Sequence, residues 1–179
     1  MPEKSNIVLF GFMGTGKTEV SKILSKRFGK IIVEMDEWIE KQEGMSISMI
    51  FDSKGESYFR GKERELIEDL SNKEDLIIST GGGVVLNPGN IELLNQNGFC
   101  VCLKALPEEI FKRTCNESHR PLLEVENPLE KIKCILRDRK QYYDKIPYSI
   151  LTDGLTVMEV VDCIADMYEE DARKNQVLM

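Results

Sequence analysis

A glycine-rich segment near the start of the chain constrains its fold more than any other feature. The segment GFMGTGKT follows directly on the apolar run NIVLF. Gly11, Gly16, Lys17 and Thr18 complete the pattern G-x-x-x-x-G-K-[ST], which lies between a predicted strand and an amphipathic helix. Glycines let backbone N–H groups converge on phosphate oxygens, and the helix N-terminus favours negative charge. We therefore predict a phosphate-binding loop rather than a flexible surface loop or a connecting glycine turn.

Short apolar runs and helical patterns alternate along the whole chain. Strands are expected at 6–10, 30–35, 75–80, 98–105 and 148–152. Apolar residues at helical spacing predict helices at 16–28, in the stretch bearing Trp38 and Ile39, twice within 46–71, and at about 107–115, 128–143 and 156–170. Pro88, near the start of NPGNIELLNQN, suits the first turn of a further helix. Strict alternation of strand and helix is typical of a parallel sheet covered on both faces. The predicted fold is α/β, a five-stranded parallel sheet sandwiched by helices, with ligands beyond the carboxyl ends of the strands.

Composition narrows the classes of function. The chain has 179 residues, which suits one domain over 1–179. Its net charge of −7 argues against nucleic acid as the main partner. No apolar stretch approaches membrane-spanning length, and the polar start MPEKSN has no signal-peptide pattern. We expect a cytoplasmic protein with no membrane partner.

The cysteine pattern argues against a zinc site and against disulfides. No C-x-x-C spacing occurs, the number of cysteines is odd, and His119 is the single histidine of the sequence. Cys100 and Cys102 alternate within an apolar run, so they are expected to face the same side of a strand. We interpret the cysteines as buried free thiols: Cys100, Cys102, Cys115, Cys134 and Cys163.

Two short segments suggest a guanine-nucleotide switch as an alternative to an enzyme. DSKG at 52–55 matches D-x-x-G, and NKED at 72–75 matches the guanine-reading N-K-x-D. A guanine-reading segment should follow a strand, whereas NKED precedes the predicted strand LIIST. The two segments are also too close together for an intervening strand and helix. We therefore favour an enzyme.

Polar residues follow the predicted second and third strands. Asp36 lies two residues after Glu34, so the two carboxylates would point the same way in an extended chain. One could hold Mg²⁺ through water while the other orients an attacking hydroxyl. Asp36 could instead cap a helix that starts near residue 37. The glycines of STGGG, at 81–83, exceed what a turn requires, so we predict close approach of a substrate to the backbone.

Two arginines also stand out. Arg60 and Glu63 lie three residues apart in a predicted helix and could form a pair. Arg139 continues the apolar stripe of its own helix, and an inward-facing arginine needs an anionic partner. That partner is either a ligand or a carboxylate in a structural salt bridge.

Taken in order, these motifs resemble the shikimate kinase family over nearly the whole chain. The resemblance rests on GFMGTGKT, VEMDEWIE, IFDSKGESYFRGKE, STGGGVV, HRPLL and RDRKQYY. It implies a nucleoside-monophosphate-kinase-like P-loop fold with a lid at about 114–126. It also implies transfer of the γ-phosphoryl group of ATP, with Mg²⁺, to the 3-hydroxyl of shikimate in aromatic amino-acid biosynthesis. Partners would be these two small molecules, and we expect a monomer.

The resemblance also implies a nucleotide side of the site. Arg113 would lie against the adenine, and Arg120 would reach the phosphates from the lid. Lys17 would contact the β- and γ-phosphates and act in catalysis with Arg120 and Asp36. The residues of the phosphate loop would be Gly14, Thr15, Gly16, Lys17, Thr18 and Glu19.

On the acceptor side, the resemblance implies that Asp36 hydrogen-bonds the shikimate hydroxyls and is the candidate base. Arg60 and Arg139 would grip the carboxylate, with Glu63 orienting them. The glycines that would contact the ring are Gly81, Gly82 and Gly83.

For the metal, Thr18 would be a ligand, and Glu34 would hold a metal-bound water. Glu34 departs from the family's usual Asp-x-Asp. Another small-metabolite kinase, acting on gluconate or a nucleoside monophosphate, is the alternative within the enzyme class.

Overall fold

The computed structural model describes residues 4–115 and 125–177. The strands are β1 (Asn6–Gly11), β2 (Ile31–Glu34), β3 (Leu76–Ser79), β4 (Gly98–Lys104) and β5 (Tyr148–Leu151). The helices are α1 (Lys17–Phe28), α2 (Met35–Glu43), α3 (Ile47–Lys54), α4 (Glu56–Ser71), α5 (Pro88–Asn97), α6 (Pro107–Thr114), α7 (Pro128–Tyr143) and α8 (Val157–Val177), with a short 3-10 turn, η1 (Val84–Leu86). Arg120 and most of the predicted lid lie outside the described residues.

Local sequence signals explain where several helices begin and end. Asn87 and Asn127 precede the prolines that open α5 and α7, and their side-chain oxygens accept from the backbone N–H groups of Gly89 and Glu130. Helix α1 ends at Gly29, which adopts the left-handed conformation with φ of 67°. The bounds of α1 and α7 agree with the predicted helices 16–28 and 128–143 to within one residue.

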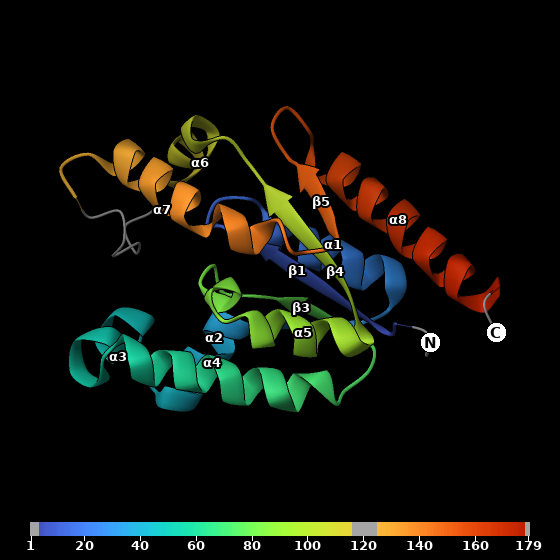
Figure 1. Ribbon diagram of the computed structural model, residues 1–179, viewed down its shortest axis with the longest axis horizontal. Helices are drawn as coiled ribbons and strands as arrows, with labels where there is room; N and C mark the ends of the chain where they lie inside the picture. Colours follow the sequence, from blue (N-terminus) through green and yellow to red (C-terminus); the bar gives the residue numbers. More distant parts are fainter. Residues whose placement is uncertain (1–3, 116–124, 178–179) are drawn as a thin grey trace.

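The five strands form one parallel sheet in the order β2-β3-β1-β4-β5 (Figure 1). The central strand β1 pairs with β3 on one side and with β4 on the other. All strands are parallel, so the segments that follow β1, β2 and β3 leave the same edge of the sheet. The predicted fold class is confirmed.

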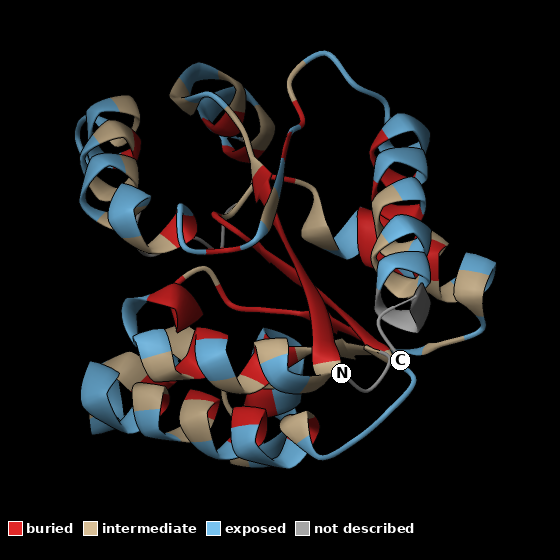
Figure 2. Cartoon of the chain, turned by 45° about the vertical axis from the view of Figure 1, so that its right-hand side comes forward, coloured by how far each residue is buried: buried red, intermediate tan, exposed pale blue. Residues whose placement is uncertain are grey.

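Alternate residues of the strands enter two separate cores. Val8 and Phe10 pack on the face covered by α2 to α7, whereas Ile7 and Leu9 pack on the face covered by α1 and α8. The inner strands β1, β3 and β4 are correspondingly buried, whereas the outer strands β2 and β5 are partly exposed (Figure 2). None of the helices within residues 4–115 and 125–177 is long and apolar enough to cross a bilayer.

The second strand is shorter than expected. It ends at Glu34, and Met35 is already the first residue of α2, with its side chain fully buried in the core. Asp36 therefore lies in the first turn of a helix rather than at the end of a strand. The interpretation of Asp36 as a helix cap is also wrong, because Glu34 occupies the N-cap position.

Only part of the prediction for the cysteines is confirmed. Cys100 and Cys102 are buried free thiols on the same face of β4, and burial raises the pKa of each to about 12. The other three cysteines are also free but exposed: Cys115, Cys134 and Cys163. They lie near the ends or on the outer faces of helices, where the sequence offers no apolar run to bury them.

The segment NKED lies at the amino end of β3, away from the glycine-rich loop. The side chain of Asn6 donates to the carbonyl of Lys73 over 2.7 Å, and the backbone N–H of Asp75 donates to Ser5 Oγ over 2.8 Å. These contacts tie a turn to the start of β1. The position supports the exclusion of the switch function.

Two isoleucines on neighbouring strands test the two-sided burial of the sheet. Ile77 in β3 is fully buried, whereas Ile31 in β2 is 70% exposed. Ile77→Ala is expected to lower the free energy of unfolding by about 2–5 kcal/mol, because it leaves a cavity. The matched control Ile31→Ala should change it by less than about 1 kcal/mol. Urea denaturation measures both, and similar losses for the two variants would contradict the assignment of the core.

Candidate active site

The glycine-rich loop after β1 adopts a backbone that requires its glycines. Gly11, Gly14 and Gly16 have φ angles of 146°, 74° and 93°, a region that other residues rarely adopt. A Cβ at position 11 would also lie 2.8 Å from the hydroxyl of Thr15. The loop then enters α1 directly, so its N–H groups and the helix N-terminus lie together.

Two side chains of the loop form hydrogen bonds with its own backbone carbonyls. The ammonium of Lys17 donates to the carbonyls of Gly11 and Phe12 over 2.8 and 3.0 Å. The buried hydroxyl of Thr15 donates to the same Phe12 carbonyl over 2.8 Å. These donors engage the carbonyls of Gly11 and Phe12 and hold the Lys17 ammonium within the loop.

The carboxylates of Glu34 and Asp36 have different neighbours, so the prediction that they point the same way is wrong. Glu34 Oε1 accepts from Ser21 Oγ over 2.7 Å, and its Oε2 lies 3.4 Å from the hydroxyl of Thr18. Asp36 instead approaches Gly81, where a Cβ would lie 2.6 Å from Asp36 Oδ1. The helical turn between the two residues separates them, since successive positions in a helix rotate by about 100° rather than alternating.

Gly81 and Gly83 allow charged side chains from two helices, α2 and α4, to approach the backbone closely. A Cβ at position 81 would lie within 2.8 Å of Glu63 Oε1 as well as of Asp36. A Cβ at position 83 would lie 2.6 Å from Arg60 Cζ. None of these glycines has a positive φ. Their lack of a side chain therefore provides space for charged groups rather than an unusual turn.

Arg60 and Glu63 form the predicted pair. Arg60 Nη1 donates to Glu63 Oε2 over 2.6 Å, and a second bond of 2.7 Å joins Arg60 to the more exposed Glu56. Glu63 is 1% exposed, and its Oε1 has no hydrogen-bond partner. Burial raises the pKa of Glu63 to about 7, and this outweighs the lowering by Arg60.

Arg139 lies partly buried against the same glycines. Its guanidinium donates to the carbonyl of Gly82 over 2.8 Å and lies 5.8 Å from the ring centroid of Phe12. The inward orientation predicted from its helix is confirmed. Tyr143 donates to the same Gly82 carbonyl over 3.0 Å, and burial raises the pKa of this phenol to about 12, so it stays protonated.

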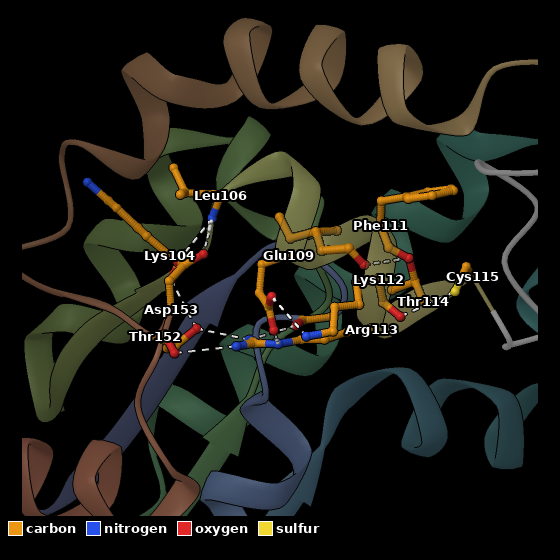
Figure 3. Close-up of polar contacts among 12 residues, drawn as sticks. Lys104, Leu106, Glu109, Phe111, Lys112, Arg113, Thr114, Cys115, Thr152 and Asp153 are labelled. Atoms are coloured by element: carbon orange, nitrogen blue, oxygen red, sulfur yellow. Dashed lines mark hydrogen bonds and ion pairs between the residues drawn. The ribbon is translucent and has the colours of Figure 1, made fainter.

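Arg113 links the glycine-rich loop to the segment after β5. It donates to the carbonyl of Gly14 over 3.2 Å and to Thr152 Oγ1 over 3.0 Å, and it also pairs with Glu109. Figure 3 shows the guanidinium of Arg113 directed between Thr152 and Glu109. This fixes its side chain beside the loop.

Three residues that contact the site were not predicted from the sequence: Ser21, Tyr143 and Thr152. Tyr143 follows Arg139 by four residues and so shares its face of α7, a spacing that could have indicated a joint role. Ser21 follows Thr18 by three residues in the same way. Thr152 carried no such signal, because its contact with Arg113 joins residues that lie 39 positions apart in the chain.

Oxygen donors near Thr18 are of the kind that Mg²⁺ prefers. No group of three or more metal-binding side chains occurs within the described part of the chain. The Thr18 hydroxyl and one Glu34 carboxylate nevertheless fit a hard cation that keeps several waters and shares phosphate ligands. The residues are thus compatible with Mg²⁺ bound together with a nucleotide.

Comparison with known proteins identifies the family. A sequence model described as shikimate kinase matches residues 13–169. A shikimate kinase from Thermodesulfovibrio yellowstonii is 48% identical over 164 residues, which are 92% of this chain and 95% of the relative. The chain belongs to the shikimate kinase family.

Other relatives and solved structures agree with this family. A shikimate kinase from Pelotomaculum thermopropionicum is 41% identical over 92% of this chain and 96% of the relative. The structure of a shikimate kinase from Acinetobacter baumannii in complex with shikimate has a TM-score of 0.88 at 33% identity, over 93% of this chain and 94% of that one. A gluconokinase from Sinorhizobium meliloti has a TM-score of 0.67 over 99% of both chains at 14% identity, a likeness of fold alone.

The buried Glu63 predicts a pH dependence of stability. Its pKa is about 7 in the folded protein against an ordinary value of 4.5. Between these pH values the folded protein keeps a proton that the unfolded chain has lost, so the free energy of unfolding falls as the pH rises. Glu63→Gln removes this group, and the stability difference between the two proteins should change by about 3 kcal/mol across the window.

Urea denaturation between pH 4.5 and 8 measures this difference. Glu65→Gln is the matched control, because Glu65 lies on the same helix with its side chain 66% exposed. Parallel pH curves for the unchanged protein and Glu63→Gln would contradict the raised pKa.

Proposed function

We propose that the protein transfers the γ-phosphoryl group of ATP to the 3-hydroxyl of shikimate, giving shikimate 3-phosphate and ADP. The observation that carries this proposal is that the glycine-rich loop lies close to the charged residues around Gly81 to Gly83. These residues are Asp36, Arg60, Glu63 and Arg139. A Cβ at Gly82 would lie 3.8 Å from Met13 N in the loop and 3.8 Å from Arg139 Nη1. A phosphoryl donor and an anionic acceptor could thus be held side by side. Membership of the family supports shikimate as that acceptor.

The nucleotide would occupy the glycine-rich loop. Backbone N–H groups would bind the phosphates, and Lys17 would neutralise charge on the β- and γ-phosphates. Arg113, held beside Gly14 and Thr152, would lie against the adenine. The phosphate-loop residues proposed to contact ATP are Gly14, Thr15, Gly16, Lys17, Thr18 and Glu19.

Thr18 would bind Mg²⁺ directly, and Glu34 would hold it through water. When bound, the ion would neutralise charge on the phosphates of ATP. The 3.4 Å separation of their oxygens and their hard-donor character support this assignment.

The acceptor would lie over the three glycines. Arg60 and Arg139 would bind its carboxylate, because guanidinium groups match carboxylate geometry. Backbone groups of Gly81 to Gly83 would contact the ring. Glu63 would orient the arginines, which is supported by its 2.6 Å bond to Arg60.

Asp36 would align the attacking hydroxyl with the phosphorus atom. In phosphoryl transfer the protein itself forms few covalent bonds. Most of the catalysis therefore comes from an in-line hydroxyl and well-placed positive charge. The proximity of Asp36 Oδ1 to Gly81 supports its location on the acceptor side. As the new P–O bond forms, Asp36 would either take the proton of the hydroxyl or accept a hydrogen bond from that hydroxyl.

The remaining expectations are part of the same proposal. One domain would span 1–179, and a lid expected at about 114–126 would bring Arg120 to the phosphates, although Arg120 itself lies outside the described residues. Closure of this lid would exclude water, which otherwise competes as phosphoryl acceptor. The protein would act as a cytoplasmic monomer.

Coupled measurement of ADP release tests the reaction. We expect rapid turnover with Mg²⁺, ATP and shikimate, and background rates with quinate, gluconate, AMP or no acceptor. Lys17→Ala controls for contaminating kinases, since it removes the lysine that contacts the phosphates. Turnover with a different acceptor alone would overturn the assignment of shikimate but leave the phosphate-binding loop in place.

Arg139→Ala tests the binding of the acceptor carboxylate. The variant should bind shikimate more weakly by about 2–5 kcal/mol, roughly 30- to several-thousand-fold, because a desolvated charge pair loses one member. Its affinity for ATP should change little. Arg137→Ala is the control, since Arg137 lies on the same helix with its side chain 78% exposed. Calorimetric titration measures both ligands, and unchanged shikimate affinity would exclude Arg139 from the site.

A further inference from the structure

A buried hydroxyl beside the glycine-rich loop has no part in the reaction described above. Ser21 lies in α1 and is fully buried. Its Oγ lies 2.7 Å from Glu34 Oε1 and 2.9 Å from the carbonyl of Thr18. A hydroxyl has one proton to donate, and a charged carboxylate forms the shorter and stronger bond. The proton of Ser21 is therefore directed at Glu34.

The partners of Glu34 are not those of a helix cap. Glu34 occupies the N-cap position of α2, yet its side chain makes no capping hydrogen bond there. Its two oxygens face Ser21 and Thr18, which both lie on α1. The carboxylate is thus turned away from its own helix and toward the end of the glycine-rich loop.

The bond to Ser21 fixes the direction of the second oxygen. A glutamate side chain has three rotatable bonds, and holding it in one orientation costs conformational entropy. With Oε1 held by Ser21, Oε2 lies 3.4 Å from the Thr18 hydroxyl. Thr18 and Glu34 also line an open groove of about 400 Å³, so a hydrated cation can reach this oxygen from solvent.

We propose that Ser21 is a positioning residue that orients Glu34 toward Mg²⁺ bound with the nucleotide. This inference rests on the proposed function, in which Thr18 and Glu34 form the metal side of the site. Ser21 touches neither metal nor substrate and acts through the carboxylate. A simple structural bond between α1 and the end of β2 is the competing explanation.

The test measures metal binding directly. Mn²⁺ is titrated into the protein with saturating ADP, and bound Mn²⁺ is followed by electron paramagnetic resonance. Ser21→Ala is expected to weaken Mn²⁺ binding about 10-fold, the lower end of the effect of partners that orient metal-binding groups. Affinity for ADP without metal should stay within about two-fold, because the phosphate-binding N–H groups are unchanged.

A double-mutant cycle separates orientation from general packing. In a Glu34→Gln background, Ser21→Ala should cause no further loss of Mn²⁺ affinity, since the group it orients no longer carries charge. Ser25→Ala is the matched control. Ser25 lies one turn further along α1, and its hydroxyl donates to the carbonyl of Lys30 over 2.6 Å, so it forms a similar structural bond without contact to Glu34.

Each outcome decides the proposal. Ser21→Ala that behaves like Ser25→Ala, with altered stability but normal Mn²⁺ affinity, overturns it. An undiminished effect of Ser21→Ala in the Glu34→Gln background also overturns it. Ser21→Cys nearly keeps the side-chain size and keeps a weak hydrogen-bond donor, so it controls for a folding defect. This variant should lose part of the Mn²⁺ affinity.

The assay with shikimate as acceptor remains independent of this result. Normal Mn²⁺ affinity in Glu34→Gln, with shikimate turnover retained, would overturn the role of Ser21 and the metal assignment of Glu34 but leave the reaction intact. Failure of the reaction itself would appear as lack of turnover in the unchanged protein.

Discussion

The pairing of β1 with both β3 and β4 is the constraint on which the site depends. Leu9 lies opposite Ser79 on one side and Val101 on the other, and the N–H of Thr80 donates to the Leu9 carbonyl over 3.0 Å. Both faces of these strands are buried, so a shift of one residue would exchange the two cores. The register therefore fixes the glycine-rich loop beside the three glycines that follow β3.

Charged side chains lie close to Gly81 and Gly83 because these two residues have no side chains. Arg60, Glu63 and Asp36 approach the backbone at distances that a Cβ would obstruct. Burial of a carboxylate oxygen without a partner costs stability, as at Glu63 Oε1. A ligand hydroxyl that donated to this oxygen would offset that cost, which is in keeping with the proposed acceptor site.

Predictions from the sequence were correct where they rested on a local pattern. They were wrong where they assumed that the backbone stays extended. The glycine-rich loop and all five strands were predicted, because motif spacing and apolar periodicity act over short distances. The prediction that Glu34 and Asp36 point the same way was wrong, because α2 begins at the buried Met35, directly after the strand. Ser21 was overlooked because its hydrogen-bond partner, Glu34, lies thirteen positions away.

The sequence by itself determined the fold class, the phosphate-binding loop and the family, since these depend on the order and spacing of residues. Only the tertiary structure decided which charged groups meet. Arg60 and Arg139 come from helices far apart in the chain, and the parallel sheet brings both to the same glycines. Burial, which raises the pKa of Glu63, likewise arises from the packing of several elements around one side chain. Local sequence patterns cannot encode such contacts, because they depend on distances through space rather than along the chain.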